Sequence, residues 1–170
     1  MRKLFFLSAV LLCFASCTNV TFVNPQPEFL ESLTEIPEKY QGRFVFSEAS
    51  DDTNEDVNIV TATTINGMSI ASDSLVVKTR GNYFYVNFLD DKGNYKLYIY
   101  QTVHCLGYEK IYAIFPNIDK EQEHLFNVIN DWSCNNGNQC YLLDRVSVNQ
   151  FNLLVNSAST DEKIELKRLK

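Results

Sequence analysis

Short runs rich in β-branched and aromatic residues recur along the middle of the chain, separated by turn-forming Gly, Asn and Asp. Runs of this length and composition are typical of β-strands joined by tight turns. They predict strands at residues 44–46, 57–63, 68–70, 75–80, 83–89, 95–103 and 110–115. Because consecutive strands joined by short connections usually pair with each other, we expect an antiparallel meander.

The clearest hairpin of this pattern lies at residues 83–103. Alternate residues form one apolar face on each strand: Phe84, Val86 and Phe88 on the first, and Leu97 and Ile99 on the second. If one face of the sheet meets the core, the register must join these two sets, because a one-residue slip moves a whole set to the other face. We therefore predict that Phe88 pairs with Leu97 across a two- or four-residue loop in which Gly93 has a positive φ. A three-residue glycine-bulge loop would pair Phe88 with Lys96 instead.

The predicted register also gathers tyrosines on the opposite face of the hairpin, namely Tyr83, Tyr85, Tyr98 and Tyr100. Rigid aromatic rings with polar tips make good contacts with sugars, apolar ligands or a protein partner. Tyrosine also suits a half-buried pleated surface, so packing in the core is the simpler interpretation. The four tyrosines are therefore a candidate binding face, with core packing as the alternative.

Two later segments change to the period of an amphipathic helix. Asp119 with Gln122 and Ser147 with Gln150 match the capping box that opens a helix. Apolar stripes follow: Leu125, Val128, Ile129 and Trp132 in the first segment, and Val148, Phe151, Leu154 and Val155 in the second. We expect both helices to pack on the sheet. Further elements are expected as a helical turn at residues 37–41 and strands at 139–146 and 163–167.

The first sixteen residues have a pattern of their own. Two basic residues precede a mostly apolar run at residues 4–14, which is followed by the small residues Ala15 and Ser16. As a helix this run would span about 16 Å at ~1.5 Å per residue, roughly half of the hydrocarbon core of a bilayer. It is too short for a permanent span, so we predict that residues 1–16 are a cleaved signal peptide.

The stretch Phe14-Ala15-Ser16-Cys17 resembles the lipobox of bacterial lipoproteins, with Phe14 where Leu is usual. The resemblance implies cleavage before Cys17, a diacylglycerol on its sulfur and a further acyl chain on the new amino terminus. Three acyl chains make dissociation from a membrane negligible. The implied address is the outer membrane of a Gram-negative envelope, facing the periplasm. The alternative is an ordinary secreted protein cleaved nearby, in which Cys17 stays a thiol.

Charge and periodicity bound the rest of the organisation. Residues 17–35 lack a sustained period and are expected to form a lipidated tether, whereas residues 36–170 are expected to form a single β-rich domain. The formal net charge is −6, and it becomes more negative once Arg2 and Lys3 leave with the signal peptide. Such a surface disfavours nucleic acid and anionic lipid headgroups as partners.

The remaining cysteines lie in an oxidising compartment if the signal peptide acts as predicted. Cys134 and Cys140 flank a turn-rich loop, so we predict a disulfide between them that is worth on the order of 2 kcal/mol. Five residues separate this pair and no second pair matches it, which argues against zinc. Cys105 is left over, and we expect it to be a buried, inert thiol.

No catalytic or cofactor site can be assembled from the sequence. His104 and Cys105 are adjacent on a predicted strand, so their side chains point to opposite faces and cannot form a dyad, although His124 could approach Cys105 in space. The acidic loop begins like an EF-hand with Asp52, Asn54 and Asp56, but its later positions fail, so a solvated loop is expected. We expect no metal, no cofactor and no enzymatic activity.

The segment IPEKYQGRF at residues 36–44 leads from a helical turn through Gly42 into a strand, as lipocalins enter their barrel through a helical turn and Gly-x-Trp. Phe44 stands in place of that Trp. Together with the lipobox, this pattern resembles small bacterial lipoproteins with a lipocalin-like domain, which implies a barrel or a curved sheet. We expect a non-enzymatic module that binds a protein partner or envelope component through its sheet face. The alternative is a lipocalin-like carrier of a small apolar ligand.

Overall fold

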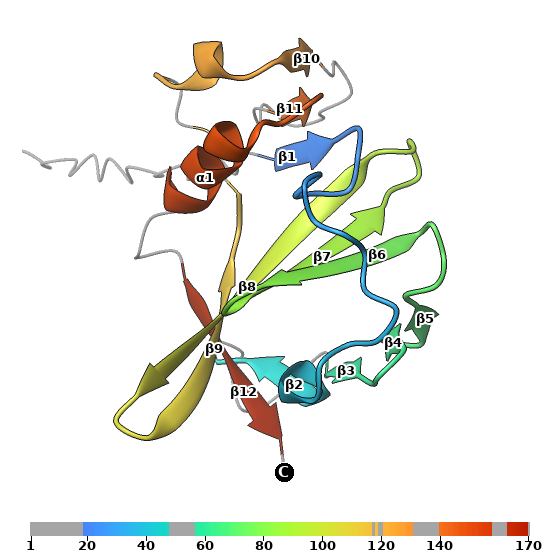
Figure 1. Ribbon diagram of the computed structural model, residues 1–170, viewed down its shortest axis with the longest axis vertical. Helices are drawn as coiled ribbons and strands as arrows, with labels where there is room; N and C mark the ends of the chain where they lie inside the picture. The colour runs from blue at the N-terminus through green and yellow to red at the C-terminus, as the bar shows by residue number, and fades with distance from the viewer. Residues whose placement is uncertain are drawn as a thin grey trace, which may run out of the picture.

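A computed structural model describes residues 19–47, 57–116, 118, 121–130, 140–157 and 163–169. In this part of the chain the fold is mainly β, and the strands join in one curved, open sheet (Figure 1). The predicted residues Cys17, Asp52, Asn54, Asp56 and Cys134 lie outside the described residues.

The strands are β1 (Asn19–Phe22), β2 (Gly42–Phe46), β3 (Asn58–Val60), β4 (Thr64–Ile65), β5 (Met68–Ser69), β6 (Leu75–Arg80), β7 (Tyr83–Leu89), β8 (Tyr95–Cys105), β9 (Tyr108–Ile114), β10 (Val128–Asn130), β11 (Cys140–Leu143) and β12 (Ile164–Leu169). The helical elements are the 3₁₀ turns η1 (Glu38–Tyr40) and η2 (Glu123–Leu125) and the α-helix α1 (Val148–Ser157). One edge-to-edge path runs β10-β11-β1-β8-β9-β12-β2-β3-β4-β5, and β6 and β7 extend from the other edge of β8. Among the described pairs, β1 with β11 is parallel and the rest are antiparallel.

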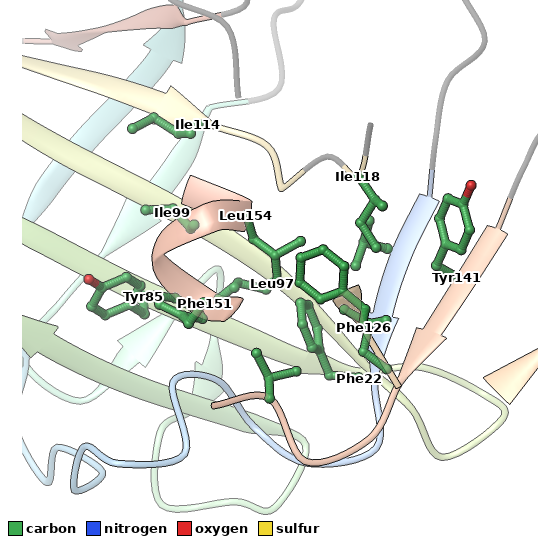
Figure 2. Close-up of a cluster of buried hydrophobic side chains, with 13 residues drawn as sticks. Phe22, Tyr85, Leu97, Ile99, Ile114, Ile118, Phe126, Tyr141, Phe151 and Leu154 are labelled. Carbon is green, nitrogen blue, oxygen red and sulfur yellow. The ribbon is translucent and has the colours of Figure 1, made fainter. Parts of the chain in front are cut away.

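The predicted meander is confirmed as β6 to β9, and a hydrophobic core covers each of its faces except at the tip of the β8–β9 hairpin. The helix-side core lies under α1 and comprises Val20, Phe22, Tyr85, Leu97, Ile99, Ile114, Ile118, Phe126, Tyr141, Leu143, Val146, Phe151 and Leu154 (Figure 2). The strand-side core lies on the other face and comprises Ile36, Tyr40, Phe44, Ile65, Ile70, Leu75, Val77, Phe84, Val86, Ile111, Ala113 and Leu166. Because each face has a core of its own, apolar residues occupy consecutive positions along β7 and β8.

The second predicted helix is confirmed as α1. Ser147 and Gln150 form the reciprocal capping box, with the Ser147 N–H donating to Gln150 Oε1 at 2.8 Å and the Gln150 N–H donating to Ser147 Oγ at 3.3 Å. Of its predicted apolar stripe, Phe151 and Leu154 are buried in the helix-side core. Val148 at the start of the helix is 43% exposed. The predicted strands at residues 139–146 and 163–167 are confirmed as β11 and β12, and the helical turn as η1.

The first predicted helix is wrong. The segment forms the short turn η2 and then strand β10, which pairs antiparallel with β11. Val128 and Ile129 are β-branched and suit a strand, and the edge of β11 offers the backbone partners that a strand needs. Helical spacing of apolar residues therefore misled the prediction, because a neighbouring strand supplied a better partner.

The expected tether is wrong for residues 19–35, which belong to the folded domain. β1 inserts between β8 and β11, and the side chain of Phe22 is fully buried. Downstream, Gln26 is also fully buried, and its backbone is held by Asn87 of β7 through a 2.7 Å bond to Oδ1 and a 2.8 Å bond from Nδ2. Polar residues without a period can thus be structural when buried partners bind their backbone.

A buried lysine fastens the same segment. Lys78 of β6 donates from Nζ to the carbonyl oxygens of Pro25 at 3.0 Å and Pro27 at 2.9 Å. Burial lowers the pKa of Lys78, and the nearby Glu28 carboxylate partly offsets this effect. The sequence predicts a tether that holds the domain off the membrane. Instead, the turn-prone stretch at residues 24–28 is bound to β6 through Lys78 and to β7 through Asn87.

The register of the β7–β8 hairpin also differs from the prediction. Phe88 pairs with Lys96 and Asn87 with Leu97, one residue away from the expected match. The loop is the three-residue alternative: Asp90 accepts backbone bonds at Oδ1 from Lys92 and Asn94, both at 2.9 Å, and Gly93 has a φ of +82° as predicted. The prediction required one face to be the only apolar face, and this premise fails because both faces are buried.

Candidate functional site

The four tyrosines do not share a face. The one-residue shift places Tyr83 and Tyr85 on the helix side of the sheet, where Tyr85 packs edge-on against Phe151 of α1 at 5.5 Å between ring centroids. Tyr98 and Tyr100 lie on the strand side with Phe84 and Phe88. The predicted four-tyrosine binding face is therefore wrong, and the side chains divide between the two cores.

The strand side of the sheet holds a cavity of about 340 Å³. This volume lies near the lower end of the range for small-molecule sites. The lining residues come from η1, β2, β3, β4 and the residue after it, β7, β8, β9 and β12: Tyr40, Phe44, Phe46, Asn58, Val60, Ile65, Asn66, Phe84, Val86, Phe88, Tyr98, Tyr100, Ile111 and Leu166. The curve of the sheet creates this space, because β2 to β4 return toward the face of β7 and β8 that carries the even-numbered residues (Figure 1).

The wall of the cavity is mostly aromatic and aliphatic. Phe84 lines it from β7, and Tyr40 stacks on that ring with centroids 4.5 Å apart, which brings η1 against the sheet. Phe88 meets Tyr98 edge-on at 5.6 Å. Asn66, which follows β4, is exposed to solvent, so the cavity reaches the surface beside that residue. An apolar ligand entering there would leave water for a largely apolar surface.

Tyr100 is the lining residue whose chemistry the cavity changes most clearly. Burial raises the pKa of the Tyr100 hydroxyl above its ordinary value, and the neighbouring Tyr98 adds to the effect. Its side chain nevertheless keeps accessible surface. The Tyr100 side chain is therefore largely surrounded by protein and faces the open space of the cavity. The Tyr100 hydroxyl therefore stays protonated and can donate a hydrogen bond.

The other candidate residues lie apart from the cavity. Cys105 is a free thiol near the tip of the β8–β9 hairpin. The expectation that it is buried is wrong, because the tip of this hairpin is exposed to solvent, as is the neighbouring His104. His124 belongs to η2, beside β10 and at the opposite end of the molecule from that tip (Figure 1). Cys140 opens β11, and because Cys134 lies outside the described residues, the disulfide stays a prediction.

Two kinds of feature are absent from the part of the chain that the structure describes. No group of three or more His, Cys, Asp or Glu side chains there is arranged to hold a metal ion. No helix in the same residues has the length and apolar character to cross a membrane.

Comparisons of the chain with protein-family models, with curated proteins and with solved structures give no match. Function is therefore inferred from the residues and from the cavity.

Proposed function

We propose that this protein is a lipid-anchored, non-enzymatic carrier that binds one small, mostly apolar molecule in the strand-side cavity. The cavity is the observation that carries the proposal, because an apolar space of about 340 Å³ is large enough for a small ligand and has aromatic walls. Binding through an exposed tyrosine face has lost its support, since Tyr83 and Tyr85 pack beneath α1. The lipocalin-like resemblance supports a carrier in the limited sense that a curved sheet surrounds the site.

The proposed anchor is the acylated Cys17, left as the first residue after a lipoprotein peptidase removes residues 1–16. The apolar run and the lipobox-like stretch support this step. β1 begins at Asn19, so a lipid on Cys17 would hold the folded domain directly at the bilayer surface rather than on a long tether. We place the domain on the periplasmic side of the outer membrane, where it could exchange apolar molecules with the lipid.

Ligand binding is tested with N-phenyl-1-naphthylamine, an uncharged probe that fluoresces in apolar sites. The chain from residue 17 onward, without lipid, contains every described element and is titrated with the probe. We expect saturable binding of one probe per chain. Val60→Phe, which places a larger side chain in the cavity, should weaken binding at least about tenfold, a loss of about 1.4 kcal/mol. Val103→Phe, at a half-buried β8 position outside the cavity lining, is the matched control.

The result that refutes the carrier is absence of saturable binding, or equal loss of binding in both variants. Anchoring has a separate test. Cells treated with an inhibitor of the lipoprotein signal peptidase should accumulate the uncut precursor, and Cys17→Ser should release the protein from the membrane fraction. A mature chain with an unmodified first residue would contradict the anchor and leave the cavity proposal intact.

A second candidate function, binding of an envelope protein, is favoured by the tip of the β8–β9 hairpin. Leu106 is 93% exposed and has a φ of +51°, and Tyr108 beside it is 76% exposed. A leucine in this left-handed conformation is strained, and strained, exposed apolar residues cluster at functional sites. Roughly 30 Å of extended strand separates this tip from Lys96, which pairs with β1 near the proposed anchor.

The tip would therefore lie away from the bilayer that holds the lipid, where it can contact an envelope protein. Crosslinking from a photoreactive residue at position 106 in cells tests this binding. One envelope protein should be crosslinked from position 106 and not from the exposed Lys92 in the β7–β8 loop. Crosslinking to lipid alone, or to the same proteins from both positions, would exclude the hairpin tip as a docking site.

A further inference from the structure

The polar groups that line the cavity differ in whether they are already engaged. Asn66 donates from Nδ2 to Asn58 Oδ1 at 3.0 Å and accepts at Oδ1 from the Ile59 N–H at 2.7 Å. By contrast, no hydrogen bond joins the hydroxyl of Tyr98 or of Tyr100 to another residue in the described part of the chain. Neither hydroxyl is among the fully buried unpaired atoms of the described residues, so each can exchange a water molecule for a partner that enters the cavity.

The two hydroxyls form one polar region of the cavity. Its other polar lining groups are the bonded pair Asn58 and Asn66 and the Tyr40 hydroxyl, which is buried without a partner among the residues that the structure describes. Tyr98 and Tyr100 are two residues apart on β8 and so project from the same face of the strand. Tyr98 contributes to the raised pKa of Tyr100, which means that the two phenol groups lie close enough to interact. Since a protonated phenol donates one hydrogen bond, the pair presents donors to whatever oxygen lies beside it.

The charge of the lining residues determines whether a charged or an uncharged ligand fits the cavity. Among the described residues that line the cavity, none is Lys, Arg, Asp, Glu or His. An ion moved from water into such a space would lose hydration without a charged lining residue to pair with, and this cost is large. A hydrogen bond from a neutral tyrosine hydroxyl can offset the cost of removing an uncharged oxygen from water. It cannot offset the much larger cost of removing a full carboxylate or phosphate charge from water.

Building on the carrier function proposed above, we infer that the ligand is an uncharged molecule with an apolar body and one oxygen that accepts a hydrogen bond from Tyr98 or Tyr100. Alcohols, esters and ketones of this kind fit the cavity. Fatty-acid anions and phospholipid headgroups do not, because each would bring an unpaired charge into it.

The test compares probes that share a twelve-carbon chain and differ in their polar end. Dodecanol, methyl dodecanoate, dodecanoate and dodecane are each used to displace N-phenyl-1-naphthylamine from the chain that begins at residue 17. The measurements are made at neutral pH, where dodecanoate is ionised. We expect dodecanol and methyl dodecanoate to bind at least about tenfold more tightly than dodecanoate.

The tyrosine hydroxyls are then removed while their rings are kept. The double variant Tyr98→Phe, Tyr100→Phe should weaken dodecanol and methyl dodecanoate about five- to tenfold and leave dodecane unchanged, because only the hydrogen bond is lost. Tyr83→Phe removes a hydroxyl on the other face of the sheet and should change none of the four affinities. Circular dichroism checks that each variant is folded.

The outcomes separate this inference from the carrier function. If the fluorescent probe binds in the cavity but dodecanoate binds as tightly as dodecanol, the carrier function stands and the inference of an uncharged ligand is overturned. Unchanged dodecanol affinity in the double variant overturns the role of the two hydroxyls. If the double variant fails to fold, the comparison of dodecanol with dodecanoate in the natural chain still decides. Absence of any probe binding refutes the carrier function itself.

Discussion

Asn87 should be among the residues on which the stability of this domain depends most. Its side chain is fully buried and makes two hydrogen bonds to the backbone of Gln26 and a third, at 3.2 Å, to the carbonyl of Val76. In Asn87→Ala the N–H and carbonyl of Gln26 remain buried without their partners. Each such group costs about 1–3 kcal/mol, so we expect a loss of roughly 3 kcal/mol in the free energy of unfolding. That is a large share of the ~5–15 kcal/mol typical of a domain.

Urea unfolding followed by circular dichroism measures this loss. Two further variants separate the hydrogen bonds from side-chain volume. Asn87→Leu fills the space but satisfies no backbone group, so we expect it to lose about as much as Asn87→Ala. Asn82→Ala removes a single bond to the Thr102 carbonyl at an exposed position, and we expect a loss below about 1 kcal/mol.

Hydrogen exchange gives a local readout of the same contact. The Gln26 amide should be protected in the natural chain and exchange much faster in Asn87→Ala, because the segment before η1 is released from β7. A loss of less than about 1 kcal/mol in Asn87→Ala, or full recovery in Asn87→Leu, would refute the claim that buried backbone groups carry the effect.

Three other predictions concern a cap, a turn and a titration. Ser147→Ala should lower the free energy of unfolding by about 1 kcal/mol, because it removes the hydroxyl that caps α1; an unchanged urea midpoint would contradict this. Leu106→Asn should raise the free energy of unfolding by roughly 0.5–1 kcal/mol, since asparagine tolerates the left-handed conformation before Gly107. A lower urea midpoint would contradict the claim that Leu106 is strained. Burial, with Tyr83 nearby, raises the pKa of Tyr85 from 10.0 to about 12. Unfolding therefore releases protons in this window, and stability should be full below pH 10 and fall as the pH rises toward 12, as thermal unfolding with tyrosinate absorbance will show.

The strands of the meander could be predicted from the sequence because their signal is local. Runs of β-branched and aromatic residues gave β6 and β7 with the observed bounds, and reciprocal capping residues gave α1. β1 and β10 could not be found in this way. Both are short and are stabilised by pairing with β11, which is distant in sequence, so their few β-branched residues are too weak a local signal to mark them as strands.

The cavity was missed for a related reason. Its wall combines even-numbered residues of β7 and β8 with residues from β2 to β4, and the curve that brings them together is a property of the whole sheet. The available signal was the run of apolar residues at consecutive positions in β7, which indicates a strand buried on both faces. Treating that run as alternating led to the wrong register and to the four-tyrosine face.

The turn between β7 and β8 has a consequence for how the domain avoids misfolding. Hydrophobicity alone scarcely distinguishes the observed hairpin from one slipped by a residue, since aromatic or aliphatic side chains would cover both sides in either case. The register is instead determined by the turn residues Asp90 and Gly93, because the bonds of Asp90 and the positive φ of Gly93 can form before any distant contact. A change at either residue would turn the slipped hairpin into a competing kinetic trap. These two turn positions should thus influence the yield of correctly folded protein more than many of the apolar residues that they align.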